Sequence, residues 1–295
     1  GVVDMAGRNR GYGNYVRIRH NASYATAYAH LSKFGAGLKR GQVRYALLLS
    51  EDGGVLDDLM VGRPFADEAQ GMLQIVVNAG TKEADFARIS ASAGDRAALR
   101  RADDDALIAI QGPEAAAVVA ELLPEAAGMA FMTLRWLTYE GQGLAVTRSG
   151  YTGEDGYEIL VPRALANGFW DRLLADSRVR PIGLGARDSL RLEAGLPLYG
   201  HDLDETVSPI EGSLAFGVGK RRRKAADFPG AQRILRELKD GPARVRVGLR
   251  VLEGDPGQQR ALDARRVLGD PRERHAVAED VLVGLAGALA VHECH

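Results

Sequence analysis

Cysteine is nearly absent from the sequence, since Cys294 is the single thiol among 295 residues. One cysteine excludes an internal disulfide framework and fits a reducing compartment, so we expect a cytoplasmic protein. No apolar run is long enough to span a bilayer, and the first residues lack the basic-then-apolar layout of a secretion signal. The sequence therefore predicts no membrane as a partner.

Net charge is nearly absent as well. The 38 Lys and Arg residues against 39 Asp and Glu residues leave a formal charge of -1. A chain so balanced has no long-range attraction to nucleic acid or to an anionic membrane. We therefore predict no nucleic-acid partner and favour small, discrete substrates. The 46% of hydrophobic residues is enough to fill the cores of two modest domains.

Strand and helix patterns alternate along the chain. Period-two alternation predicts a β-hairpin over 15–31, and helical spacing of apolar residues predicts several helices further on, the first of them capped by Thr81. This mixture, joined by short Gly-rich turns, favours an α+β fold in which helices cover antiparallel sheets. The expected strands are 43–50, 55–62, 72–80, 106–112, 143–150 and 156–162, and the expected helices are 81–93, 113–123, 163–176 and 184–194.

The composition changes near residue 254. The stretch 255–295 is rich in Ala, Arg, Leu, Val and Gly and shows no clear strand alternation. We expect an irregular, poorly ordered tail with a helix over 276–290, and a shift of reading frame would explain the change. The closing "HECH" offers two histidines and a cysteine but no fourth ligand, so a frayed terminus is favoured over a metal site.

The stretch "RSGYTGEDGYEILVP" (148–162) holds the densest group of unusual residues. Its glycines form a tight turn, after which Glu158 lies on a strand whose neighbours Tyr157 and Ile159 face the other way. A glutamate that merely faces solvent is the alternative. A functional carboxylate would accept paired hydrogen bonds from a planar amino-amide edge such as that of a pterin, which contributes about 1.5 to 3 kcal/mol.

Two further stretches place charged residues where they could bind a ligand. In "GGVLDDLM", Asp57 and Asp58 face opposite sides of a strand, so at most one of them points into a given pocket and the other is expected in solvent. An Asx-type turn is the alternative there. In "GLGARDSLRLE", Arg187 and Arg191 fall four residues apart on one helix face, where two guanidinium groups would grip a carboxylate, and ordinary surface salt bridges are the alternative.

These groups occur within a longer series of motifs. In order they are "RYALLLSEDGGVLDDLMV", "VVNAG", "ALIAIQGP", "FMT", "VTRSGYTGEDGYEILVP", "GLGARDSLRLEAGLPLYGHDLDE", "SPIEGSLAFGVGKRRRKAADFPGA" and "RVGLRVLEG". Together they resemble the aminomethyltransferase of the glycine cleavage system, the T-protein, from about residue 41 to 254. The resemblance implies the T-protein folate-binding fold over 43–254, without its amino-terminal part.

The resemblance also implies an activity. The family transfers the one-carbon unit of an aminomethyl group, carried on the lipoyl arm of the H-protein, to tetrahydrofolate and releases ammonia. By resemblance Asp58 is the catalytic carboxylate, Glu158 holds the pterin, and Arg187 belongs to the same folate site. Asn78 and Tyr151 are expected to line the pocket. Tetrahydrofolate is thus the expected one-carbon acceptor, the lipoylated H-protein the expected partner, and no metal is expected.

Residues 1–42 resemble a different family. "YGNYVRIRH" followed by "TAYAHLS" is similar to an internal piece of the lysostaphin-type zinc endopeptidases, with His30 in the place of their catalytic-site histidine. A catalytic zinc needs three protein ligands, and the other ligand motifs of that family are missing, so we expect no peptidase activity. We expect a peptidase-like hairpin joined near Gly41-Gln42 to the folate domain. A folate-binding protein without turnover, in a truncated chimaera, is therefore the alternative to an active enzyme.

The run "GKRRRKAADFPG" is strongly basic within a neutral chain. Such a run is more often a solvated face than a nucleic-acid site. A role in docking an acidic carrier or the polyglutamate tail of folate is a hypothesis.

Overall fold

A computed structural model describes residues 2–9, 13–19, 25–31, 38–65, 72–247 and 281–285. The chain forms two compact units. The first comprises Gly1–Tyr45, Leu59–Leu190 and Glu279–His295, and the second comprises Ala46–Asp58 and Arg191–Ala278.

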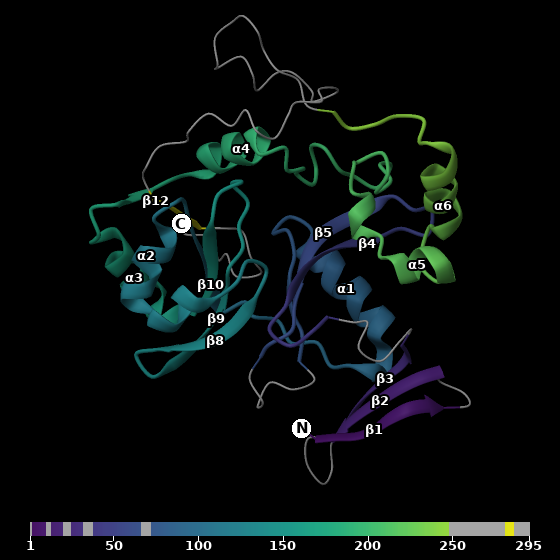
Figure 1. The fold of residues 1–295 in the computed structure, drawn as a ribbon, viewed down its shortest axis with the longest axis horizontal. Coiled ribbons are helices and arrows are strands. Elements are labelled where there is room, and N and C mark those ends of the chain that lie inside the picture. Colours follow the sequence, from purple (N-terminus) through teal and green to yellow (C-terminus); the bar gives the residue numbers. More distant parts are fainter. Residues whose placement is uncertain are drawn as a thin grey trace, which may run out of the picture. The chain divides into compact units, whose positions relative to one another are not determined.

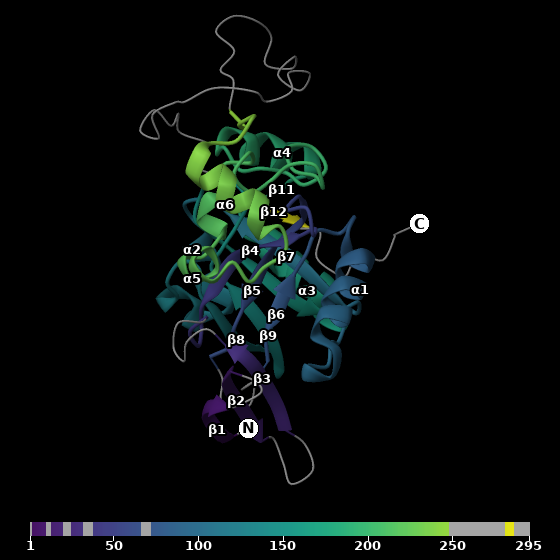
Figure 2. The ribbon, with the colours of Figure 1, turned by 90° about the vertical axis from the view of Figure 1, so that its right-hand side faces the viewer.

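The first unit begins with a small antiparallel sheet in the order β1-β2-β3 (Figure 2). Its strands are β1 (Val2–Asn9), β2 (Gly13–Arg19) and β3 (Ala25–Leu31). The pair β2 and β3 is the hairpin predicted over 15–31, which is confirmed. The alternation pattern does not reveal β1, which pairs antiparallel with β2.

A six-stranded sheet, in the order β11-β12-β7-β10-β9-β8, forms the main layer of the first unit. Strand β10 pairs antiparallel with β7 on one side and with β9 on the other. The antiparallel pairing and the helices described below confirm the predicted α+β class. The strands are β7 (Asp105–Gln111), β8 (Leu134–Tyr139), β9 (Gln142–Thr147), β10 (Gly156–Pro162), β11 (Val179–Pro181) and β12 (Val281–Leu285).

The prediction of a helix over 276–290 is wrong where the structure describes this stretch. Residues Val281–Leu285 form strand β12, which lies parallel to β11 and antiparallel to β7. Val281 and Val283 are β-branched and favour an extended backbone. A five-residue run shows too little alternation to reveal a strand that depends on partners far away in the sequence. The rest of the predicted tail lies outside the described residues.

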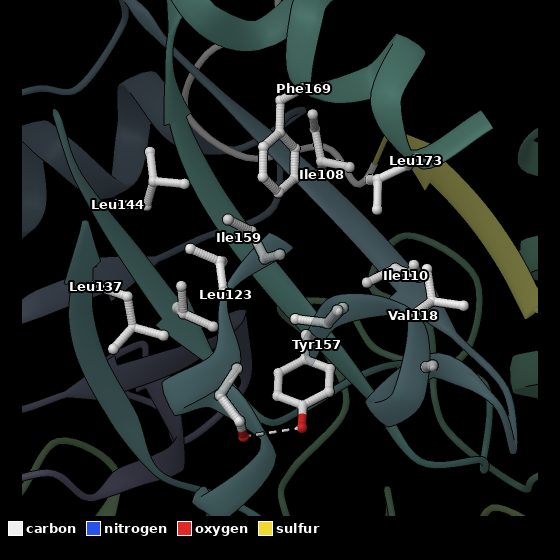
Figure 3. Close-up of a cluster of buried hydrophobic side chains, with 14 of the residues drawn as sticks. Ile108, Ile110, Val118, Leu123, Leu137, Leu144, Tyr157, Ile159, Phe169 and Leu173 are labelled. Carbon is white, nitrogen blue, oxygen red and sulfur yellow. Dashed lines mark hydrogen bonds between the residues drawn. The ribbon is translucent and has the colours of Figure 1, made fainter. Parts of the chain in front are cut away.

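Helices α2 and α3 cover one face of the six-stranded sheet (Figure 1). Tyr157 and Ile159 of β10 are fully buried in the main core, to which Phe169 and Leu173 of α3 also belong (Figure 3). The Tyr157 hydroxyl donates to the carbonyl of Ala126 at 3.1 Å, so the buried phenol keeps a hydrogen bond. Burial of each such side chain stabilises by about 1.5 to 3 kcal/mol. The helices are α1 (Lys82–Ala93), α2 (Ala115–Leu122), α3 (Arg163–Leu174) and α4 (Leu184–Glu193), which confirms the four predicted helices within a few residues.

Thr81 precedes α1 as predicted but does not cap it with its side chain. Its hydroxyl donates instead to the carbonyl of Asn78 at 3.1 Å. The hydroxyl therefore closes the turn between β6 (Gln74–Val76) and α1, and the predicted hydrogen bond to the helix N–H groups is wrong.

A second, three-stranded sheet has the order β4-β5-β6. The strands are β4 (Val43–Leu49), β5 (Val55–Gly62) and β6 (Gln74–Val76). Within the first unit, Val43, Met60 and Val76 of these strands pack against the face of the six-stranded sheet that carries Leu107 and Leu160. That face is opposite to the one covered by α2 and α3, because Leu160 alternates with Ile159 along β10.

A buried network of charges organises the second unit. Glu211 and Glu237 are both nearly inaccessible, and Arg233 bonds to each of them at 2.8 Å. The Ser208 hydroxyl donates to Glu237, and Arg244 donates to Glu211. Buried charges are tolerated only when they are paired in this way. The helices of this unit are α5 (Lys220–Ala225) and α6 (Ala231–Asp240) (Figure 2).

The basic run forms α5 and the turn after it. Arg221 and Arg222 pair with Asp227, and Arg223 donates to the carbonyl of Val218 at 2.7 Å. These three arginines hold the local chain together.

The turn between β4 and β5 packs tightly against other backbone of the second unit. A Cβ added at Gly54 would lie 1.6 Å from the carbonyl oxygen of Glu205, and Val55 N–H donates to the carbonyl of Val207 at 2.9 Å. Only glycine leaves room for this approach.

We therefore expect Gly54→Ala to lower the free energy of unfolding by about 1 to 3 kcal/mol, because the backbone must move apart. Gly80→Ala is the matched control, since a Cβ at Gly80 meets nothing within 4 Å. Urea titrations followed by circular dichroism measure both variants. Equal midpoints for the two variants would contradict the close approach at Gly54.

Candidate functional site

Strand β10 places Glu158 on the face of the six-stranded sheet away from the main core. Tyr157 and Ile159 are buried on the core side, and alternation turns Glu158 to the opposite side. In the sheet register Glu158 lies beside Thr147 of β9 and Ala109 of β7. The sequence-based expectation that this carboxylate and its two neighbours face opposite sides is confirmed.

Glu158 lines a small cavity within the first unit, whose walls come from strands β4, β5 and β6 and from the six-stranded sheet. The cavity is lined by both apolar and polar residues. The cavity has room for about one water molecule, so a larger ligand enters only when lining side chains move. The walls are Val43, Met60, Gly62, Val76 and Leu107, and the polar residues are Gln74, Thr147, Ser149 and Glu158.

Two hydroxyl groups orient Glu158. Ser149 Oγ donates to Glu158 Oε2 at 2.8 Å, and Thr147 Oγ1 donates to the Glu158 backbone carbonyl at 3.1 Å. Burial raises the pKa of the Glu158 carboxyl above its ordinary value, while the Ser149 hydrogen bond and the charge of Arg187 oppose that rise. Burial is the largest of these causes, so the carboxyl takes up a proton more readily than a solvated glutamate does.

The buried amide of Gln111 holds the loop that carries Ser149. Gln111 is 3% exposed at the end of β7. Its Nε2 donates to the carbonyls of Ser149 (3.0 Å) and Tyr157 (3.2 Å), and its Oε1 accepts from the Thr152 hydroxyl at 3.1 Å. A Cβ at Gly150 would lie 1.7 Å from Gln111 Oε1. Sequence reasoning missed Gln111, and the glycine spacing of "SGYTGEDG" was the available signal.

An ion pair closes the same loop. Arg148 bonds to both carboxylate oxygens of Asp155, at 3.0 and 2.6 Å. These hydrogen bonds lower the pKa of Asp155 below its ordinary value. The loop therefore has its shape fixed at its base by a charged pair and at its centre by an amide.

Tyr151, at the tip of this loop, stacks with Arg187 of α4. The guanidinium carbon of Arg187 lies 4.6 Å from the centre of the Tyr151 ring, which is a cation-π contact. Both residues are half-buried, and neither lines the cavity. The charge of Arg187 still acts on Glu158, so the structure brings these three predicted site residues into one electrostatic group.

Arg191 has a different role from Arg187. It is 4% exposed, and its Nη1 donates to Asp202 Oδ2 at 2.6 Å and to the carbonyl of Leu196 at 3.3 Å. We expected Arg187 and Arg191 to bind one ligand carboxylate together. In the structure Arg191 is instead paired with the carboxylate of Asp202. This ion pair belongs to the second unit.

The two adjacent acids of β5 differ in exposure. Asp57 is fully buried. The expectation that the acid next to Asp58 lies in solvent is therefore wrong. Asp58 is half-buried. Residues two apart on a strand share a face, which puts Asp58 on the same side of β5 as Met60, a residue of the cavity wall. Asn78 is half-buried and follows β6, where its carbonyl accepts the Thr81 hydroxyl.

Within the described ranges, no group of three or more His, Cys, Asp or Glu side chains is arranged to hold a metal ion. The helices of that same part of the chain are all too short or too polar to cross a membrane.

The raised pKa of Glu158 has a consequence for stability. A carboxyl with a higher pKa when folded stabilises the protein below its unfolded pKa, about 4.3, and loses that contribution as the pH rises through its folded pKa. Glu158→Gln removes this titration. We expect the unfolding free energy of the variant, relative to wild type, to increase as the pH rises from about 4 to about 8.

Urea unfolding at a series of pH values measures this difference. Glu140→Gln, the same carboxylate-to-amide change at an exposed position, is measured alongside as the control. A difference between Glu158→Gln and wild type that stays constant with pH would show that Glu158 titrates like an ordinary glutamate.

Comparisons with known proteins identify the family. A model of the GCVT N-terminal domain matches residues 26–222, and a model of peptidase family M23 matches residues 1–43. The second match agrees with the resemblance predicted for residues 1–42. The first match begins earlier than the predicted junction, so the two overlap before residue 43.

Several curated proteins are similar to this chain. The probable mitochondrial aminomethyltransferase of Schizosaccharomyces pombe is 47% identical over 203 residues, 68% of this chain and 51% of that protein. The mitochondrial aminomethyltransferase of Homo sapiens is 45% identical over 228 residues, 75% of this chain and 55% of that protein. The chain thus spans about half the length of these relatives. Both are mitochondrial, which lends no support to the expected cytoplasmic location.

A solved structure is similar in fold. The glycine cleavage system aminomethyltransferase T from Bartonella henselae is 44% identical and superposes with a TM-score of 0.65, over 74% of this chain and 58% of that one. Because the GCVT family model covers more than half of the sequence, the chain belongs to the family of the GCVT N-terminal domain.

Proposed function

We propose that this protein transfers the one-carbon unit of an aminomethyl group, carried on the lipoyl arm of an H-protein, to tetrahydrofolate with release of ammonia. The observation that carries the proposal is Glu158, whose carboxylate accepts from the Ser149 hydroxyl and whose backbone carbonyl accepts from the Thr147 hydroxyl, in a cavity with largely apolar walls. The names of the similar aminomethyltransferases and of the similar T-protein structure support the same reaction. The lipoylated H-protein is the proposed partner, and the cytoplasm the proposed location.

Glu158 is the proposed ligand of the pterin ring. An ionised carboxylate accepts two parallel N–H bonds from the amino-amide edge of a pyrimidine, which the apolar walls then cover. Because burial raises its pKa, ligand donors favour the ionised form and bind less tightly at low pH. Met60 and Gln74 are unbranched, so rotation of their side chains is the least costly way to widen the cavity for a ring.

Arg187, Tyr151 and Asn78 are proposed as further folate contacts. The stacked Tyr151 and Arg187 present a planar cationic surface beside the loop of Ser149. Such a surface suits the carboxylates and the aromatic ring of a folate tail. Asn78 offers an amide at the end of β6, the strand that also carries Gln74.

Asp58 is the proposed catalytic carboxylate. A positioned ionised acid near the reacting folate nitrogen stabilises positive charge on an iminium-like carbon or relays a proton. Its place on the Met60 side of β5 supports this role. Asp57 is its nearest competitor, because it is the more deeply buried of the two acids.

The alternative function is folate binding without turnover. It is favoured by one observation, the M23 match over residues 1–43, which overlaps the start of the GCVT match at residue 26. Under this alternative Glu158 still grips the pterin, and the carrier does not deliver its aminomethyl group.

Two measurements separate these functions. We expect isothermal calorimetry to detect tetrahydrofolate binding, and an aminomethyl-loaded H-protein to release ammonia when the enzyme and tetrahydrofolate are present. Glu158→Gln should weaken the affinity for tetrahydrofolate by about 10-fold or more, because a neutral amide replaces a charged acceptor. Binding without ammonia release supports the alternative function. Unchanged affinity in Glu158→Gln would place the pterin elsewhere.

Substitution of the two acids of β5 tests the catalytic role. We expect Asp58→Asn to lower the rate of ammonia release by about 10² to 10⁴-fold, the range for one acid-base group, with a smaller effect on tetrahydrofolate affinity. Asp57→Asn is the matched comparison on the same strand. Wild-type rates in Asp58→Asn would remove it from the mechanism, and a loss confined to Asp57→Asn would assign the role to Asp57.

A further inference from the structure

Gln74 carries a buried acceptor that the fold does not use. The residue lies at the start of β6 and lines the cavity that contains Glu158. Its Oε1 is buried and accepts no hydrogen bond from any residue in the described part of the chain. Buried polar atoms are rarely left unpaired in folded proteins, because the lost hydration is not replaced. An unpaired amide oxygen at a cavity wall is therefore available to any donor that enters the cavity.

The hydroxyl donors of the cavity are already engaged. The Ser149 proton goes to Glu158 Oε2, and the Thr147 proton goes to the Glu158 carbonyl. Unused acceptors therefore remain in the cavity, namely the remaining lone pairs of the Glu158 carboxylate and Oε1 of Gln74. A matching ligand presents several N–H donors, at more than one edge.

We propose that Gln74 is a specificity-determining residue that accepts a hydrogen bond from a ring N–H of the reduced pterin and thereby selects tetrahydrofolate over folic acid. The inference rests on the proposed function. Both molecules share the amino-amide edge that Glu158 reads, so Glu158 does not distinguish them. In the reduced pyrazine ring both nitrogens carry hydrogen, whereas in folic acid both present lone pairs, which a carbonyl oxygen repels. A site built around one hydrogen bond rejects the analogue that lacks the donor.

The test compares Gln74→Met with wild type, because methionine keeps the length of the side chain and removes the acceptor. Calorimetry under anaerobic conditions gives the dissociation constants for tetrahydrofolate and for folic acid. We expect Gln74→Met to weaken tetrahydrofolate binding by roughly 10-fold and to leave folic acid binding unchanged or tighter, so that the preference for the reduced ring falls. Gln142→Met, the same change at an exposed amide of β9, should alter neither constant.

Stability without ligand is the second readout. Removal of an unpaired buried acceptor should raise the urea midpoint of the ligand-free protein, although the affinity for tetrahydrofolate falls. A residue with only a structural role would lower both stability and affinity. An unchanged preference between the two ligands in Gln74→Met overturns the inference while the proposed function stands. Failure of the wild-type protein to bind tetrahydrofolate overturns the proposed function and the inference together.

Discussion

The packing of β10 into the main core is the constraint on which the candidate site depends. Tyr157 and Ile159 are fully buried in this core, and the Tyr157 hydroxyl is tied to the carbonyl of Ala126. A slip of β10 by one residue would bring Glu158 into this core and expel Tyr157, which costs both apolar burial and the desolvation of a charge. The main core therefore sets the direction of the carboxylate, although none of the buried residues of that cluster lines the cavity.

The loop between β9 and β10 transmits this constraint to the polar groups around Glu158. Gln111 lies on β7, next to β10 in the sheet, and binds the loop through the carbonyl of Ser149 and the hydroxyl of Thr152. Gly150 gives the amide the space it occupies. Ser149 and Tyr151 thus inherit their positions from a strand of the core, and a preorganised loop of this kind loses little entropy when a ligand binds.

Short-range patterns in the sequence revealed a large part of this arrangement. Alternation gave the strand of Glu158 and its direction, and the motif resemblance drew attention to Arg187 and Tyr151, which stack in the structure. Contacts between segments far apart in the sequence could not be predicted from such patterns. The burial of Asp57, the amide bonds of Gln111 and the strand at Val281–Leu285 all depend on segments far away in the chain. Neither composition nor periodicity specifies which distant segment packs against or pairs with a given residue. These features are therefore seen only in the folded structure.

The free protein keeps two groups in the cavity in an unfavourable state. Burial raises the pKa of Glu158, which means that its charge is poorly solvated, and Gln74 holds an acceptor that pairs with no donor among the residues the structure describes. Each lowers the stability of the ligand-free fold relative to a wall of apolar residues. A ligand rich in N–H donors pairs with both groups at once. The free energy that these groups cost the ligand-free protein is then recovered on binding, which favours such a ligand over one that lacks those donors. Local conflicts with the rules of stable packing are expected at functional sites for this reason, and these two occur at the same cavity of the first unit.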